Sequence, residues 1–417
     1  NSFLYRMSNV LRISNILLCF IPLALLTGPF LPDFFLSIIC LLFLATMSKE
    51  KINRYFKNIF FYIFLSFNIF LISISLFSED ILFSLRSSLF YFRFFLFSFA
   101  VWYLLDQNKQ LIKYFFYVLL IAYTYSLIDG YSQYFLGSTL SGIEISGLRL
   151  TLPFNDKLIL GGYIARLFPL LVGLYIYCIE KSYKNYLILA FLFVLSDVLV
   201  FVTGERTAIV LMTLSTIAII FLISEFRLLR IISFFISFML ILVISVSNNE
   251  IKERNIDFTM EQIGIGENRE IRIFSPVHDS LIKTALNMFL ENPLTGQGPN
   301  TFRKLCDDVK FKYDPNSCST HPHNNLIQLL AETGIIGLIY FFIFLMFILI
   351  DISKYIFFYY FRNQKIINNA QVCIYIAFLL TAWPLIPTLN FFTNWINIIY
   401  YLPFGFFLYF RYSNLKN

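Results

Sequence analysis

Long apolar runs recur about twelve times in this chain, and their length limits what the chain can fold into. A helix needs about 20 mostly apolar residues to cross ~30 Å of hydrocarbon, and lipid leaves no backbone hydrogen-bonding group unpaired. Hydrophobic residues make up 58% of the sequence and charged residues 14%, which is far from the composition of a soluble domain. The sequence therefore predicts an all-α, polytopic membrane bundle of about twelve transmembrane helices. The runs lie near residues 12–29, 33–48, 58–77, 88–105, 111–130, 158–178, 185–203, 206–224, 229–247, 324–350, 369–389 and 394–411.

Lysine and arginine residues collect in alternate short loops, and this pattern predicts the orientation of the helices. Positive charge is retained on the cytoplasmic side of a membrane, so both termini are expected inside. The segments 131–157, 204–207 and 248–322 then share the outer face. The net charge of +7 is explained by this topological signal and by some attraction to anionic membrane lipids, and it does not indicate nucleic acid.

Three parts of the chain follow from this topology. Residues 1–247 hold helices one to nine, residues 248–322 form an outer loop, and residues 323–417 hold helices ten to twelve. Within the loop, Asp279-Ser280 is expected to cap a helix that ends at Asn292-Pro293, followed by a second short helix around 301–305. The loop is therefore predicted to be a helical cap over the bundle.

Two of the six cysteines, Cys306 and Cys318, lie in the outer loop, and the other four lie in apolar runs. An oxidising compartment favours pairing of the two loop cysteines. We therefore predict a disulfide between them.

Several charged residues lie where lipid would penalise them, so they are functional candidates. Arg206 opens the eighth run directly after Glu205, at a helix N-terminus that attracts anions, and we expect it to bind substrate. Arg149 and Arg272 are either substrate contacts or solvated charges. Arg93 and Asp197 are either structural buried charges or substrate contacts.

All three histidines, His278, His321 and His323, fall within one polar stretch of the chain. His323 lies at the mouth of the tenth span, where a neutral imidazole can act as a base or hydrogen-bond partner. A structural cap is the plainer alternative. A His-x-His metal chelate, with Cys306, Cys318 or Asp308 as further ligands, is another alternative, but a second ligand pair at metal-binding spacing is missing.

The sequence from His323 resembles the signature of the O-antigen ligase family. His323-Asn324, nine residues, Gly334, two residues and Gly337 follow the family pattern of His, Asn/Ser/Gln, nine residues, Gly, two residues and Gly/Thr/Tyr. The large loop between the ninth and tenth spans is a further likeness. Other similar stretches are Arg206-Thr207-Ala208, Asn292 to Gly298, Asp129 to Gln133, and Gly137 to Arg149 ahead of Phe154.

The resemblance implies an integral-membrane glycosyltransferase of the bacterial inner membrane, with its active site on the periplasmic side. Such a protein moves a glycan from a polyprenyl (undecaprenyl) diphosphate donor to a lipid A–core acceptor. The related O-antigen polymerases instead extend lipid-linked repeat units, and this alternative stays open. A transporter or flippase for lipid-linked glycans is a third candidate, although such proteins often show repeated halves, which are not evident here.

The residue chemistry suits such a transfer. Guanidinium groups match phosphate oxygens, so Arg206 is expected to bind the diphosphate, with Arg149 and Arg272 as further contacts. His323 is expected to accept the proton of the acceptor hydroxyl. His321 and Asn324 are included as substrate-binding residues. Attack opposite the diphosphate would invert the anomeric centre. No Asp-x-Asp metal site stands out in the outer segments, so we predict a reaction that needs no metal, and no other cofactor is expected.

Overall fold

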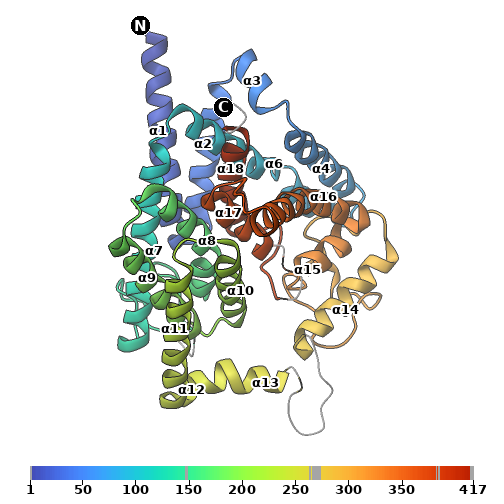
Figure 1. Cartoon of the computed structure of the whole chain (residues 1–417). Helices are drawn as coiled ribbons and strands as arrows, with labels where there is room; N and C mark the ends of the chain where they lie inside the picture. Colours follow the sequence, from blue (N-terminus) through green and yellow to red (C-terminus); the bar gives the residue numbers. More distant parts are fainter. Residues whose placement is uncertain are drawn as a thin grey trace.

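Helices account for the regular structure of this chain, as seen in a computed structural model (Figure 1). The structure describes residues 2–145, 149–262, 264, 274–381, 383 and 386–413. In these ranges the only extended pairing is two isolated bridges, so the predicted all-α fold is confirmed. Each apolar run forms a helix: α1 (Ser2–Ala24), α2 (Phe30–Ala45), α4 (Ile59–Ser75), α6 (Phe92–Gln107), α7 (Leu111–Leu136), α8 (Leu160–Cys178), α9 (Tyr183–Val202), α10 (Arg206–Leu222), α11 (Arg227–Ser247), α16 (Asn325–Phe361), α17 (Asn369–Thr381) and α18 (Asn394–Ser413).

The apolar helices differ in length. Among the described residues, seven helices are long and apolar enough to cross a membrane, or eight if the bent pair α3 (Lys49–Tyr55) and α4 forms one span. α2, α10 and α17 are apolar but shorter. The chain is thus a multi-pass helical membrane protein, while the number of about twelve crossings stays a prediction.

The bundle is held together by close helix pairs. α18 packs along α6, and α17 packs along α8. Where α18 packs along α6, a Cβ atom added to Gly405 of α18 would lie only 2.4 Å from Cβ of Val101 on α6. Small residues allow such close approach, which drives packing inside lipid where the hydrophobic effect does not act between helices.

Two charges that the sequence left open are members of ion pairs between helices. Arg93 Nε lies 3.0 Å from Asp33 Oδ1, and Arg230 Nη1 lies 3.1 Å from Asp197 Oδ2. The Arg230 side chain is fully buried. A buried charge is tolerated when it is paired and hydrogen-bonded, so Arg93 and Asp197 have a structural role.

The segment between α11 and α16 forms a polar arm and a cap. The arm consists of α12 (Asn249–Lys252), the π-helix η2 (Glu253–Asp257) and α13 (Phe258–Gln262). The cap contains α14 (Pro276–Glu291) and α15 (Phe302–Leu305), and α14 packs against α16. The predicted helical cap is therefore present.

One local prediction in the cap is wrong. α14 begins at Pro276, and its N-cap is Ser275, whose hydroxyl accepts from the backbone N–H of His278. The expected cap at Asp279-Ser280 lies inside the helix instead. Proline is favoured in the first helical turn because its missing N–H would have no helical partner there, and this allows the helix to start one turn earlier.

The predicted disulfide between Cys306 and Cys318 is present, with their Cα atoms 4.9 Å apart. It lies in the cap, close to a small apolar core formed by Leu281, Ala285, Met288, Phe302, Leu305, Cys306, Phe311 and Ala331. The disulfide closes a loop within the cap, and the core connects the cap to α16 through Ala331.

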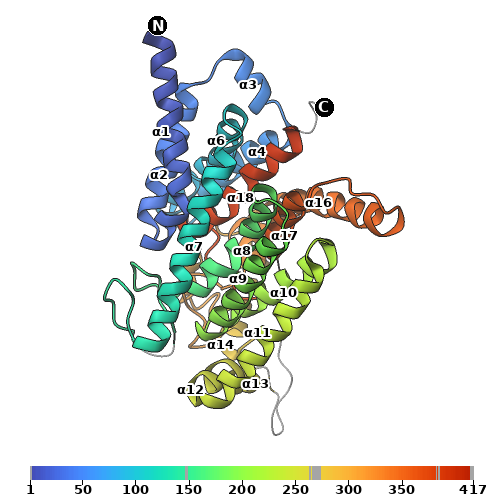
Figure 2. The ribbon, with the colours of Figure 1, turned by 60° about the vertical axis from the view of Figure 1, so that its left-hand side comes forward.

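The ends of the bundle differ in what they carry. α1 begins and α18 ends toward the same end of the molecule, while α12 and α13 lie at the opposite end (Figures 1 and 2). This arrangement agrees with the predicted topology, in which the two ends of the chain lie on one side of the membrane and the segment 248–322 lies on the other.

Candidate functional site

A cavity of about 790 Å³ lies where several polar segments meet. Its wall draws on all three segments that the sequence placed on one face, 131–157, 204–207 and 248–322. Further lining residues come from the segment 386–389 between α17 and α18, from His323, from Leu158 and Ile159, and from Arg166 on α8 and Val210 on α10. The lining residues are Arg149, Asp156, Lys157, Leu158, Ile159, Arg166, Gly204, Glu205, Arg206, Thr207, Val210, Arg254, Thr259, Gln262, Phe274, Ser275, His278, His323, Ile386, Pro387, Thr388 and Leu389.

Positive charge dominates this lining. Four arginines and one lysine face only two carboxylates, Asp156 and Glu205. None of the four guanidinium groups forms a salt bridge with a carboxylate of the described residues. We define the arginine wall as Arg149, Arg166, Arg206 and Arg254. Guanidinium groups that outnumber the carboxylates in a cavity are suited to bind an anion.

Arg206 is the first residue of α10. Its Nη1 donates to Gln262 Oε1 at 2.6 Å, and Thr259 Oγ1 lies at 3.5 Å. Both partners are neutral groups on α13, so they orient the guanidinium without cancelling its charge. The free backbone amides at the start of α10 add to the positive potential.

Arg149 is held from two directions. Its Nη2 donates to the carbonyl oxygen of Leu158 at 2.5 Å. Two residues further along, the backbone of Thr151 exchanges two hydrogen bonds of 2.9 Å with the side-chain amide of Gln133 on α7. Gln133 also donates to Asp129 Oδ2 at 2.7 Å, and Asp129 Oδ1 accepts from the backbone N–H of Leu140. The polar end of α7 therefore anchors the loop that carries Arg149.

Glu205 connects α10 to the start of α8. Its two oxygens accept from the backbone N–H groups of Gly161 at 2.8 Å and Gly162 at 3.1 Å. Burial raises the pKa of this carboxyl group to about 7, although Arg149, Arg166 and both amides act in the opposite direction. Its charge therefore changes near neutrality.

Arg254 reaches the cavity from η2 and donates through Nε to the carbonyl oxygen of Gly204 at 3.4 Å. Burial and the neighbouring charge of Arg149 lower the pKa of Arg254, but an arginine stays protonated under these conditions. The polar arm thus supplies a cation as well as the residues that orient Arg206.

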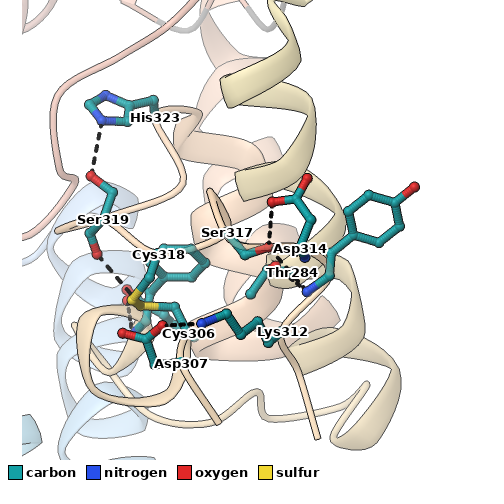
Figure 3. The surroundings of a disulfide bond; sticks show 12 residues. Thr284, Cys306, Asp307, Lys312, Asp314, Ser317, Cys318, Ser319 and His323 are labelled. Carbon is teal, nitrogen blue, oxygen red and sulfur yellow. Dashed lines mark hydrogen bonds and ion pairs between the residues drawn. A yellow bond between two sulfur atoms is a disulfide. The ribbon is translucent and has the colours of Figure 1, made fainter. Parts of the chain in front are cut away.

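His323 lies just before α16, with a positive backbone φ of 54°. Its carbonyl oxygen accepts from the backbone N–H of Thr388 at 2.8 Å, and its Nε2 lies 3.4 Å from Ser319 Oγ. Figure 3 shows the imidazole above Ser319, which follows the disulfide-bonded Cys318. Burial lowers the pKa of His323, so the ring is neutral near pH 7 and has one nitrogen able to accept a proton.

His321 lies against His323, with ring centroids 4.0 Å apart. Its Nε2 is 2.9 Å from the carbonyl oxygen of Thr388, and because a carbonyl only accepts, this nitrogen carries the proton. Burial lowers the pKa of His321 to about 3. Its Nδ1 lies 2.9 Å from Thr320 Oγ1, so both ring nitrogens have hydrogen-bond partners while the ring packs against His323.

The first glycine of the motif, Gly334, has a structural explanation. α16 breaks at Gly334 (φ 63°, ψ −167°), and the loop 293–298 fills the break. Ile335 N–H donates to the carbonyl oxygen of Pro293 at 2.9 Å, while Gln297 N–H donates to that of Ala331 at 3.0 Å. A Cβ on Gly334 would lie 2.3 Å from the carbonyl carbon of Leu294. The motif that begins at His323 and the stretch from Asn292 to Gly298, which both resemble the family, are thus hydrogen-bonded to each other at this break.

The predicted site residues separate into three groups. Arg149, Arg206 and His323 line the cavity. His321 and Asn324 are buried beside it, and Asn324 caps α16 by accepting from the backbone N–H groups of Leu326 and Ile327. Arg272 lies outside the described residues.

Sequence reasoning did not assign Arg166, Arg254 or His278 to the site. Arg166 is visible in the sequence as a charge inside the apolar run 158–178. Arg254 lies in a polar stretch with many charges, so no signal distinguishes it. Only the folding of the arm onto the start of α10 brings it to the cavity.

The metal alternative loses two of its three further ligands, since Cys306 and Cys318 are joined in the disulfide. In the described part of the chain, no group of three or more His, Cys, Asp or Glu side chains is arranged to hold a metal ion. Independence from metal stays a prediction.

The fold and site define a multi-pass helical membrane protein with an arginine-rich, imidazole-bearing cavity at one end. Residues 189–342 match the family model described as O-antigen ligase. This match, from α9 to the first half of α16, supports the likeness to the O-antigen ligase family that the motif predicted. It contains Arg206, the arm, the cap and His323. Comparison with curated proteins gives no match.

Proposed function

We propose that this protein is a glycosyltransferase of the O-antigen ligase type. It transfers a glycan from an undecaprenyl diphosphate donor to a lipid A–core acceptor, at the periplasmic side of a bacterial inner membrane. The observation that carries the proposal is that the arginine wall and His323 share one cavity. A diphosphate ester and an acceptor hydroxyl need these two kinds of group side by side.

The donor's diphosphate would lie against the arginine wall. Arg206 and Arg149 bind its oxygens, and Arg254 and Arg166 add positive charge. When the bond between the anomeric carbon and the diphosphate oxygen breaks, the leaving group gains one negative charge. Fixed guanidinium groups stabilise that charge more strongly than they stabilise the bound donor, which lowers the barrier.

The acceptor hydroxyl would lie at His323. Its oxygen forms the new bond to the anomeric carbon, and its proton passes to the neutral imidazole. A base of this kind contributes roughly 10²–10⁴-fold. Attack from the face opposite the diphosphate inverts the anomeric centre, and the reaction releases polyprenyl diphosphate and a proton.

The proposed location has two supports. The disulfide in the cap is typical of proteins in oxidising compartments such as the periplasm. The positive-inside pattern of the loops supports a location of the cap outside the cytoplasm. ATP is absent there, which is consistent with the use of a pre-activated lipid-linked donor.

A competition assay with purified protein tests the function. A polyprenyl-diphosphate-linked oligosaccharide is offered together with lipid A–core and with lipid-linked repeat units. Product on lipid A–core is the expected result. Longer lipid-linked glycan would instead identify a polymerase, and folded protein that forms neither product would contradict the glycosyltransferase proposal.

A further inference from the structure

His278 is a second imidazole on the cavity wall, and the reaction proposed above does not use it. It lies in the first turn of α14, on the cap side of the cavity. Its ring centroid is 5.4 Å from that of His323, and the two planes meet at 81°. The cavity therefore has an imidazole side as well as the arginine wall.

The orientation of His278 is fixed through one of its two ring nitrogens. Nδ1 lies 2.6 Å from Ser275 Oγ, and the same hydroxyl oxygen accepts from the backbone N–H of His278 at 3.4 Å. The Ser275 hydroxyl therefore serves as cap of α14 and as partner of the ring. Nε2 has no hydrogen-bond partner among the described residues, and it is the nitrogen left for a ligand in the cavity.

The electrostatic surroundings determine what this ring can do. Burial, His323 and Arg206 together lower the pKa of His278 to about 4, so the ring is neutral at physiological pH. A base this weak takes a proton from an alcohol poorly. If the Ser275 hydroxyl donates its proton to Nδ1, then Nε2 carries the proton of the neutral ring and can donate it to an oxygen atom.

We propose that His278 is an acceptor-binding residue, whose Nε2–H donates a hydrogen bond to a sugar hydroxyl next to the one that attacks. This inference rests on the proposed function. The diphosphate is drawn to the arginine wall, so the sugar that carries the attacking hydroxyl lies at His323. Neighbouring hydroxyl oxygens of one sugar ring lie about a hydrogen-bond length apart, and two imidazoles at this spacing can reach both.

A purely structural role is the alternative, because Ser275 and His278 also form the start of α14. The two roles differ in what they affect. A structural residue would change protein stability and the kinetics of both substrates alike. An acceptor-binding residue would change the KM of one substrate.

The test measures steady-state transfer by the full-length purified protein, with lipid A–core and the polyprenyl-diphosphate oligosaccharide each varied in turn. Loss of one hydrogen bond of about 1–1.5 kcal/mol corresponds to roughly a five- to twelvefold change. His278→Ala is therefore expected to raise the KM for lipid A–core by about that factor and to leave the donor KM within about twofold. If the wild type prefers lipid-linked repeat units, these serve as the acceptor.

Two more variants separate shape from hydrogen bonding. His278→Gln keeps a donor group, and His278→Phe keeps a flat ring without one. The proposal requires the Gln variant to retain an acceptor KM nearer to the wild-type value than the Phe variant does. Equal values for the two would overturn it, and this comparison still decides if His278→Ala does not fold. Val277→Ala, at an exposed neighbour outside the cavity lining, is the matched control.

The outcomes also distinguish this inference from the proposed function. A wild-type protein without transfer would contradict the function itself. Transfer by the wild type, with an inactive His323→Ala variant and a normal acceptor KM for His278→Ala, would contradict the role of His278 alone. A rise in the donor KM for His278→Ala would also overturn it.

Discussion

Thr388 donates its backbone N–H to the carbonyl oxygen of His323 at 2.8 Å. The same residue accepts a hydrogen bond from His321 Nε2 at 2.9 Å. Thr388 lies between α17 and α18, whereas both histidines precede α16. The position of the proposed base therefore depends on a segment that lies outside the part of the chain matched to the O-antigen ligase family.

His323→Ala should abolish transfer while leaving the fold intact, because the variant loses the proton acceptor. We expect kcat to fall by roughly 10²–10⁴-fold, with an unchanged melting temperature. His278→Ala should retain much more of kcat, because that residue only binds. Normal turnover by the His323 variant would contradict its role as base.

Arg206→Lys should reduce kcat/KM by roughly 10–100-fold, which corresponds to about 1–3 kcal/mol of lost transition-state binding. Lysine keeps the charge but cannot form the planar fork, and it cannot reproduce the bond to Gln262 in the same geometry. Arg86→Lys, on the exposed surface of α5 (Ile81–Ser88), is the control. Equal activity of both variants would show that charge alone is sufficient.

The charge of Glu205 should make donor binding depend on pH. Its pKa is raised to about 7, so the carboxyl group is neutral below that pH and the cavity gains one net positive charge. The donor KM should then fall by roughly three- to tenfold between pH 8 and pH 6, since an opposing charge nearby is removed.

Glu205→Gln tests this explanation, because it removes the titrating group and keeps a similar shape. The variant should show a low donor KM at both pH values. Glu291→Gln, at an exposed ion pair with Lys310 on the cap, should behave as the wild type does. The same pH dependence in the Glu205 variant would show that another group is responsible.

Gly334→Ala should lower the melting temperature strongly. The change combines an unfavourable positive φ, which costs about 1–3 kcal/mol, with a Cβ placed 2.3 Å from the backbone of Leu294. Gly142 also has a positive φ, but a Cβ there meets no atom within 4 Å. Gly142→Ala should therefore show only the smaller backbone cost, and an equal effect of the two changes would contradict the role of close packing at Gly334.

The disulfide should stabilise the cap and keep His323 active. Opening a loop with a sequence separation of 12 residues returns about 3 kcal/mol of entropy to the unfolded chain. Cys306→Ser should lower the melting temperature and, because Ser319 beside the disulfide contacts His323, also lower kcat. Alkylation of denatured, unreduced protein should modify only Cys19, Cys40, Cys178 and Cys373; modification of Cys306 and Cys318 as well would contradict the pairing.

The sequence by itself determined the helical class and most of the helix positions. The reason is that a long apolar run has no stable conformation in lipid other than a helix, which pairs all of its backbone groups. The positions of α7, α9 and α11 therefore follow from local composition. The motif beginning at His323 likewise identified the family, because it is a local pattern of residue types. The N-cap of α14 at Ser275 was missed, since Asp279-Ser280 and Ser275 offer similar capping groups.

Only the tertiary structure decided how the site is assembled. Arg254, Glu205 and His278 lie far apart in the sequence, and no periodicity links them. They meet because the polar arm folds onto α10 and the cap packs on α16, through contacts that depend on Gln262, Ser275 and the break at Gly334. Tertiary contacts also separated the structural charges from those of the site, since Arg93 and Asp197 have charged partners whereas the arginine wall forms no salt bridge among the described residues.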